Sequence, residues 1–191
     1  MGIDDAIVQL AEKLDAWIDT NLDALSSMNQ AERVKAVRTA LEITMDLERI
    51  KAEGVAAIKA VLDNRGAAAQ NERVASLVRS FEFAAKLSNT LSDEWLDTDG
   101  ANQVVDLEND IALQLDATGS GRVALAVLLD HADAGIRASA GAHLVDLMPD
   151  RVLPILREIE ENEHANSAHF TAHWAILGWE REGKFKARRP D

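Results

Sequence analysis

The sequence predicts an all-α protein, and three observations predict that class. Apolar residues recur every three or four positions along nearly the whole chain. Alternation of period two never persists over five residues, and β-branched residues are sparse. Residues 119–159 can be divided almost without gaps into short consecutive helices, a pattern typical of helix-pair repeats of the HEAT type. We therefore expect a HEAT-like stack of about eight or nine helices.

The expected organisation is one main helical domain with an addition at each end. Residues 66–185 are expected to form the HEAT-like domain, because stacked units bury their apolar faces only against neighbours. Residues 1–65 are expected to form an added N-terminal helical segment. Residues 186–191 form a short basic tail, which continues a run of five positive charges that begins at Arg181.

The N-terminal segment shows helical periodicity from its beginning. An apolar stripe over residues 3–18 predicts the first helix. Asn29 is placed to cap a second helix, because Glu32 three residues later completes a capping-box-like pattern. Gly54 predicts a break or kink in that helix, and residues 55–62 then predict a short helix of their own.

Two longer helices are expected in the middle of the chain. The first carries an apolar stripe from Val74 to Trp95. The sequence Asp97-Thr98-Asp99-Gly100 predicts a turn. Residues 104–115 then carry the next stripe, which ends at Thr118-Gly119.

Residues 119–159 contain helix-start signals at regular spacing. Ser120 is expected to cap the helix that carries residues 123–129, and Asp133 is expected to accept hydrogen bonds from the free amides of the next helix. Pro149 stands near the start of a third helix, where proline is tolerated. Pro154 is close enough to that start to be harmless or mildly kinking.

Small residues are concentrated in the second of these helices, where they allow neighbouring helices to approach closely: Ala138, Ala140, Gly141 and Ala142. A last helix is expected over about residues 166–182. Trp179 shares an apolar stripe with Ala172 and Ile176 on that helix, so we expect it in the core.

The charge of the chain bounds its partners. The formal net charge is −13, and no Lys or Arg occurs between Lys86 and Arg122. A field of this sign repels phosphate backbones, which argues against nucleic-acid binding. It would steer a basic protein towards the chain, although acidity also serves plain solubility.

Other compositional features exclude some settings. No apolar run approaches the ~20 residues needed to cross a bilayer, so we expect no membrane association. The chain has no cysteine, and its N-terminus is acidic where a secretory signal is basic. These features together fit the cytoplasm.

The acid-rich interval supplies the candidate partner-binding site. Trp95 lies among acids, and binding energy concentrates in buried tryptophan anchors. We expect a basic partner to contact the following residues: Asp93, Glu94, Trp95, Asp97, Asp99, Asp106 and Asp110.

Two groups of residues could carry chemistry, and neither is expected to do so. His169 and His173 are four residues apart on one helix, beside His164, Glu163 and Asn166. A stable zinc site requires three or four protein ligands, so we expect no metal or other cofactor here.

The sequence Asp130-His131-x-Asp133 could be read as an acid–base cluster. It has no nucleophile or oxyanion donor beside it, so we expect it to end one helix and cap the next. Thr118-Gly119-Ser120-Gly121 could offer amides to an anion, but it lacks the Lys-Ser/Thr ending of a phosphate loop.

A family resemblance rests on residues 119–160. The pattern is Gly121-Arg122-x-Ala124-Leu125-x-x-Leu128-Leu129-Asp130-His131-x-Asp133-x-x-Ile136-Arg137. Ala140, Ala142, His143, Leu144, Pro149, Leu156-x-x-Ile159 and a closing Leu177-x-Trp179-x-x-x-Gly183-Lys184 extend it. The chain resembles the bacterial family called domain of unknown function twenty-nineteen over about residues 66–185. That family consists of small HEAT-like helical proteins without an established activity. Related proteins are encoded beside toxins, so the resemblance implies an immunity role.

The sequence as a whole favours a non-enzymatic protein-binding module. In its sharpest form it is a bacterial immunity protein that occludes a basic toxin domain. A scaffold or adaptor without inhibitory role is the alternative, and a metal-dependent enzyme that uses His169 and His173 is a less favoured one. The oligomeric state and the identity of the partner do not follow from the sequence.

Overall fold

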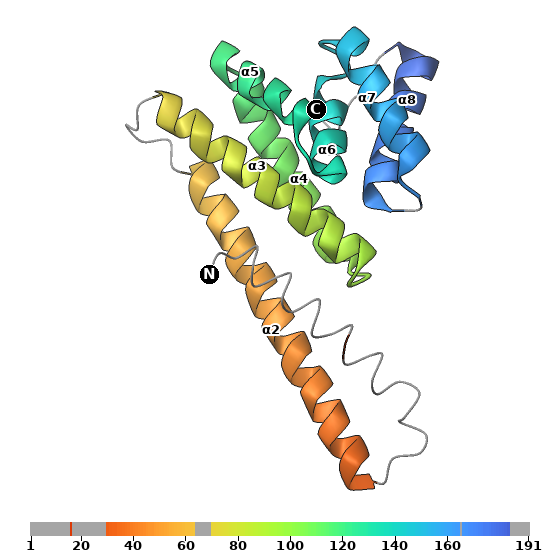
Figure 1. Ribbon diagram of the computed structural model, residues 1–191. Helices are drawn as coiled ribbons and strands as arrows, with labels where there is room; N and C mark the ends of the chain where they lie inside the picture. The colour runs from red at the N-terminus through yellow and green to blue at the C-terminus, as the bar shows by residue number, and fades with distance from the viewer. Residues whose placement is uncertain (1–15, 17–29, 64–69, 165, 184–191) are drawn as a thin grey trace. The chain divides into compact units, whose positions relative to one another are not determined.

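A computed structural model describes residue 16 and residues 30–63, 70–164 and 166–183 of the 191-residue chain, and within these ranges it contains helices and no strand. The all-α prediction is therefore confirmed for the described residues. The chain divides into two compact units, Met1–Ala57 and Ile58–Asp191. Figure 1 shows their helices. The Asn29 cap, the predicted boundary after residue 65 and the basic tail all lie outside the described residues.

The first unit contains most of α2 (Gln30–Asp63), which is a single uninterrupted helix. The predicted break at Gly54 is wrong. A glycine inside a helix costs about 1 kcal/mol relative to alanine, which the backbone hydrogen bonds and buried apolar residues on either side can offset. Gly54 and its neighbour Val55 are themselves buried, as are Leu47 and Ile50 one to two turns earlier.

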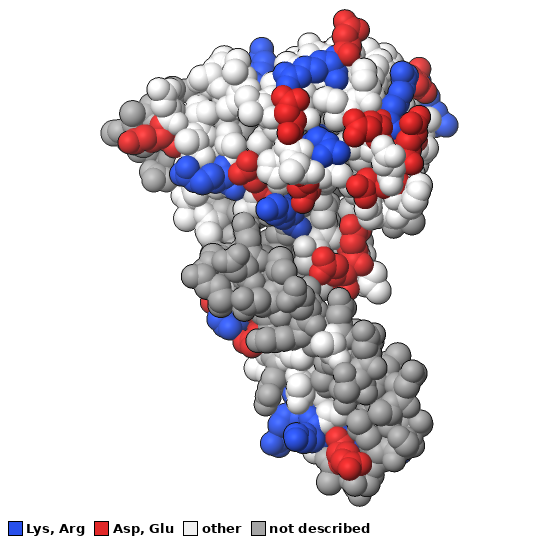
Figure 2. Space-filling model, viewed as in Figure 1, with Lys and Arg blue, Asp and Glu red and all other residues white. Residues whose placement is uncertain are grey.

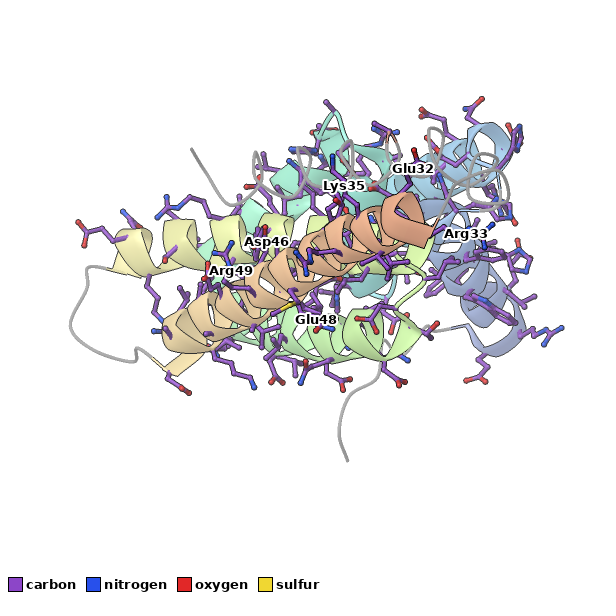
Figure 3. The ribbon with its side chains drawn as sticks, turned by 90° about the horizontal axis from the view of Figure 1, so that it is seen from below. Glu32, Arg33, Lys35, Asp46, Glu48 and Arg49 are labelled. Atoms are coloured by element: carbon purple, nitrogen blue, oxygen red, sulfur yellow. The ribbon has the colours of Figure 1, made fainter. Side chains whose placement is uncertain are left out.

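Charged side chains on α2 pair along the helix. Arg49 lies 2.9 Å from Asp46 and 3.5 Å from Glu53, and Lys51 lies 2.9 Å from Glu48. Figure 3 labels three of these residues, Asp46, Glu48 and Arg49. The hydrogen bond and charge of Asp46 raise the pKa of Arg49 above its usual value. Exposed pairs at this spacing support a helix only slightly, and salt screens them.

The second unit contains the remaining helices and one turn of 3-10 helix. They are α3 (Gln70–Asp93), α4 (Thr98–Asp116), α5 (Gly119–Val127), η1 (Leu128–Asp130), α6 (Ala134–Leu144), α7 (Pro149–Asn162) and α8 (Ser167–Glu182). The described part of the chain thus holds seven α-helices, α2 to α8, against the eight or nine expected for the whole chain. α3 and α4 pack side by side, and α6 contacts α3, α7 and α8 (Figure 1).

The central helix α6 is built from small residues, as the sequence predicts. Ala138 and Ala140 are fully buried, and a Cβ atom on Gly141 would lie only 2.7 Å from Cδ2 of Leu156 on α7. Such a distance is closer than real Cβ contacts, so the missing side chain sets the spacing between α6 and α7. α6 can therefore contact four other α-helices of the second unit, α3, α5, α7 and α8.

Most helix starts in the second unit follow the sequence signals, but the predicted turn over residues 97–100 is wrong, because α4 already begins at Thr98. Asp133 accepts a hydrogen bond from the Ile136 amide at 3.0 Å, which confirms its predicted cap. α7 begins at Pro149, as predicted, and continues through Pro154. The prediction for Ser120 is wrong, because Thr118 caps α5 by accepting a hydrogen bond from the Gly121 amide at 3.0 Å. Ser120 is already inside the helix, two residues after its cap.

The end of α8 is also as expected. Asn166 precedes the helix and accepts a hydrogen bond from the His169 amide at 2.9 Å, so the predicted range of about 166–182 is confirmed. Trp179 is only partly buried, in contrast to the fully buried Ala172 on the same stripe. None of the described helices combines the length and apolar character that crossing a bilayer requires.

Candidate functional site

The second unit contains a groove of about 420 Å³ between α4 and α8. One face of each helix forms a wall, since the lining residues recur every three or four positions on both. The floor comes from α3 and α6. The lining residues are Ser88, Asn89, Ser92, Thr98, Ala101, Asn102, Val105, Asp106, Glu108, Asn109, Ser139, Ala142, His143, Ser167, Phe170, Thr171 and Trp174.

Small side chains on α6, in the floor, leave the space of the groove open. Ser139 and Ala142 are the α6 residues that line it besides His143. Gly135 at the start of α6 admits the amide of Asn89, because a Cβ atom there would lie 2.0 Å from Asn89 Nδ2. The same composition that lets α6 pack centrally therefore leaves a hollow on its other side.

A carboxylate from the α4 wall and an imidazole from α6 face each other at the base of the groove. Glu108 is 5% exposed, and its Oε1 lies 3.6 Å from Nε2 of His143. That separation exceeds the 2.7–3.2 Å of a normal hydrogen bond. The second oxygen, Oε2, is buried and has no hydrogen-bond partner among the described residues. The ring of His143 is held edge-on against Phe81, with centroids 5.7 Å apart.

The rim of the groove is aromatic and exposed. Phe170 and Trp174 are 51% and 58% exposed, and they lie four residues apart on the same face of α8. Val105 on the opposite wall is 40% exposed. Large apolar side chains clustered at a concave site are typical of interaction surfaces, whereas isolated ones are ordinary.

The groove lining is acidic. Among the lining residues that the structure describes, Asp106 and Glu108 are acids and none is Lys or Arg. Elsewhere in this unit basic residues are paired with acids between helices, as in Arg151–Asp130 at 2.9 Å and Arg157–Glu180 at 3.2 Å. Acidic and basic side chains are interspersed on the face of this unit that Figure 2 shows.

The structure separates the predicted partner-binding residues into different roles. Asp93 accepts hydrogen bonds from the amide and hydroxyl of Ser167, at 2.6–3.0 Å, and so caps α8. Asp97 caps α4 by accepting from the Gly100 amide at 2.9 Å. Both side chains support the fold, although both carry the predicted charge.

The remaining predicted acids lie at the surface. Glu94, Asp99, Asp106 and Asp110 are exposed, and Asp106 lines the groove. Of the seven predicted residues, therefore, only Asp106 lies in the groove.

Trp95, the predicted anchor, is partly buried in the turn between α3 and α4, and its indole N–H is buried without a partner among the described residues. The neighbouring Leu96 is the exposed apolar residue of this turn, at 80%. Leu96 also has a positive φ of 53°, a backbone conformation that L-residues adopt at a cost. The apolar side chain that this turn offers to a partner is thus Leu96.

The two histidines singled out in the sequence bond to one residue of α7. Nδ1 of His173 lies 2.7 Å from Oε1 of Glu160, and Nδ1 of His169 lies 3.1 Å from the Glu160 carbonyl oxygen. Their rings are parallel within 7° at 6.3 Å. Within the described residues, no group of three or more His, Cys, Asp or Glu side chains could hold a metal ion. The pair therefore joins α8 to α7.

The Asp130-His131-x-Asp133 cluster forms the start of α6. Asp133 is its cap, and Nδ1 of His131 accepts a hydrogen bond from the Asp133 amide at 3.0 Å. Arg137 donates to the carbonyl oxygens of His131 and Ala132, both at 2.9 Å. The polar contacts of His131 and Asp133 thus serve the chain turn, whereas Asp130 pairs with Arg151 of α7 at 2.9 Å.

Sequence reasoning did not select Glu108, His143, Phe170 or Trp174 as a site. One local signal was present, since Glu108 stands within the apolar stripe of α4, directly after Leu107 and one turn before Ile111. A carboxylate in that position is buried at a cost, which makes it a candidate for function.

The comparisons with known proteins add no relative. No family model, curated protein or solved structure matches the chain.

Proposed function

We propose that this protein is a non-enzymatic binding module that holds a basic partner protein in the groove between α4 and α8. The observation that carries the proposal is the pair of exposed aromatic side chains, Phe170 and Trp174, on the rim of an acid-lined groove. Exposed aromatics at a concave site are the side chains that concentrate binding energy in protein interfaces.

The negative charge of the groove indicates the charge of its partner. Its described lining contains two carboxylates and no Lys or Arg, and on the α4 side it belongs to a 35-residue stretch of sequence without Lys or Arg. Complementary charge raises the association rate and disfavours acidic proteins. A basic protein is therefore the partner that fits both the local and the long-range electrostatics.

The finer architecture that we propose is the HEAT-like stack expected from the sequence. The packing of α6 on α7 and α8, and of α6 on α3, supports it. Solenoids of this kind use their surfaces to hold partners.

The sharpest form of the proposal is a bacterial immunity protein that occludes a basic toxin domain. This form rests on the family resemblance, and its alternative is a scaffold that leaves its partner active. The two differ in one measurement, because only an immunity protein abolishes the activity of the partner when the complex forms.

The test is the binding kinetics of a purified basic partner, identified by cross-linking and mass spectrometry. Trp174→Ala should raise the dissociation rate at least tenfold, because it removes an exposed side chain that the partner buries in the complex. Raising the salt from 50 to 500 mM should lower the association rate, because exposed charges are screened.

The matched control for this experiment is Val127→Ala. Val127 is also an exposed apolar residue, but it lies on α5 and outside the groove lining. It should change both rates less than twofold. If Trp174→Ala and Phe170→Ala bind as the wild type does, the interface lies elsewhere.

A further inference from the structure

We propose that Glu108 receives a single arginine side chain of the partner, which enters the groove between Asp106 and the aromatic rim. This inference rests on the proposed function and names the chemical group that the groove recognises. Three independent observations support it: an incomplete hydrogen-bonding environment, an anionic lining and a pair of exposed aromatic rings.

The first observation is the missing donor at Glu108. Its Oε2 has no partner among the described residues, and its Oε1 is 3.6 Å from His143 Nε2, too far for a hydrogen bond of normal length. A buried carboxylate that lacks donors destabilises a fold. A buried carboxylate of this kind can be completed by a donor from another molecule, since the described residues supply none to Oε2.

The second observation is what surrounds this carboxylate. The groove lining also contains hydroxyl and amide groups, from Ser88, Asn89, Asn109 and Ser139, and none of the described lining residues is Lys or Arg. Ser88 already donates its hydroxyl hydrogen to the Ala85 carbonyl oxygen at 3.0 Å. An entering cation would therefore meet acceptors and no competing Lys or Arg side chain among the described lining residues. Oε2 is itself shielded from water, so the cation must displace the side chains that cover it.

The third observation concerns the shape of the cation. Phe170 and Trp174 present two ring faces or edges on one side of α8. A guanidinium is planar, weakly hydrated and able to stack on aromatic rings, and it donates two parallel hydrogen bonds to one carboxylate. A lysine ammonium is strongly hydrated and cannot make the bidentate contact. These properties favour arginine over lysine.

The experiment uses the full chain and a matched pair of peptides, acetyl-Gly-Gly-Arg-Gly-Gly-amide and the same peptide with citrulline in place of arginine. Citrulline has nearly the same shape but no charge. Binding is followed by the amide and indole resonances of the ¹⁵N-labelled protein. The arginine peptide should shift the resonances of Glu108, His143 and the Trp174 indole. The citrulline peptide should bind at least tenfold more weakly, since hydrogen bonds to a charged group contribute about that much or more.

The variant that tests the residue is Glu108→Gln, which keeps the shape and removes the charge. It should weaken the arginine peptide about tenfold or more and should weaken the partner protein similarly, while the thermal midpoint stays at or above that of the wild type. Glu161→Gln on α7 is the control, because Glu161 is exposed and outside the groove lining. It should change binding less than twofold. Should Glu108→Gln fail to give a wild-type circular dichroism spectrum, Glu108→Leu replaces it.

The outcomes separate this inference from the proposed function. A partner whose binding depends on Trp174 but not on Glu108, with equal affinity for the two peptides, overturns the inference and leaves the proposed function standing. An arginine peptide that binds at Glu108, in a protein for which no basic partner depends on Trp174, overturns the proposed function. A lowered thermal midpoint in Glu108→Gln with unchanged binding shows that Glu108 supports the fold only, and the inference fails.

Discussion

Two histidine–glutamate pairs in the second unit have opposite characters. His173 and Glu160 join α8 to α7 at a partly exposed position, and their atoms are 2.7 Å apart. His143 and Glu108 join α6 to α4 in the floor of the groove, where they are buried and 3.6 Å apart. The exposed pair has good geometry, and the buried pair leaves one carboxylate oxygen without a partner in the part of the chain that the structure describes.

The difference between the two pairs indicates which of them is the candidate for function. A pair with short contacts in a partly solvated place is complete, and its contribution to stability is small. A buried pair with a long contact costs more free energy than it returns, unless a further donor is supplied. The exposed pair is thus satisfied in its hydrogen bonding, and the buried pair is not. Substitutions in the two pairs should therefore change the free energy of unfolding by different amounts and with different signs.

The largest effect is expected for His143→Ala. It removes a ring that packs against Phe81 and leaves Glu108 with no neighbouring imidazole. The free energy of unfolding should fall by about 2–4 kcal/mol, because a cavity forms and a buried carboxylate loses the imidazole that faces it. Urea denaturation at neutral pH measures it. A loss below about 1 kcal/mol would mean that the floor of the groove is more solvated than the structure indicates.

A smaller effect of opposite sign is expected for Glu108→Leu. It replaces an incompletely bonded carboxylate by an apolar group of similar length, so the free energy of unfolding should rise by about 1 kcal/mol. Thermal and urea unfolding of the purified variant give the sign. Destabilisation by more than about 1 kcal/mol would show that Glu108 is satisfied in the fold, and the contrast between the two pairs would disappear.

The smallest effect is expected for His173→Ala, which breaks the exposed pair. Because both partners are partly solvated, the free energy of unfolding should fall by at most about 1 kcal/mol. Glu160→Gln should have a similar effect, and the two substitutions together should cost about as much as one alone if they remove one contact. A loss as large as that of His143→Ala would make the α7–α8 contact the more important of the two.

Local structure was largely predictable from the sequence because its causes are local. The Asp133 cap and the Pro149 start each depend on residues within one turn of the helix end. The same reasoning was wrong at Gly54, where a long helix tolerates one glycine, and at Ser120, where Thr118 two residues earlier takes the cap. At both positions the local sequence is compatible with more than one structure, and packing decides which structure forms.

The groove was not predictable because it arises from residues far apart in the chain. Trp95 and Trp174 both lie among apolar and polar neighbours in the sequence, and only the packing of the helices leaves Trp174 exposed and Trp95 partly buried. Glu108 gave a signal as a charge within an apolar stripe, but its missing donor depends on where His143 of α6 lies. The acidic character of α4, by contrast, was evident from the sequence and persists in the groove lining.

The cap that Asp93 provides for α8 bears on the order in which the chain assembles. It joins residues 74 positions apart, whereas the pairings of α3 with α4 and of α7 with α8 are between consecutive helices. Contacts between neighbouring helices close short loops and form quickly, and contacts of high sequence separation must first overcome a larger loop entropy. The two helix pairs can thus form before Asp93 meets Ser167. Because α4 and α8 belong to different pairs, the groove between their walls is completed only when the pairs dock, and so it forms late in folding.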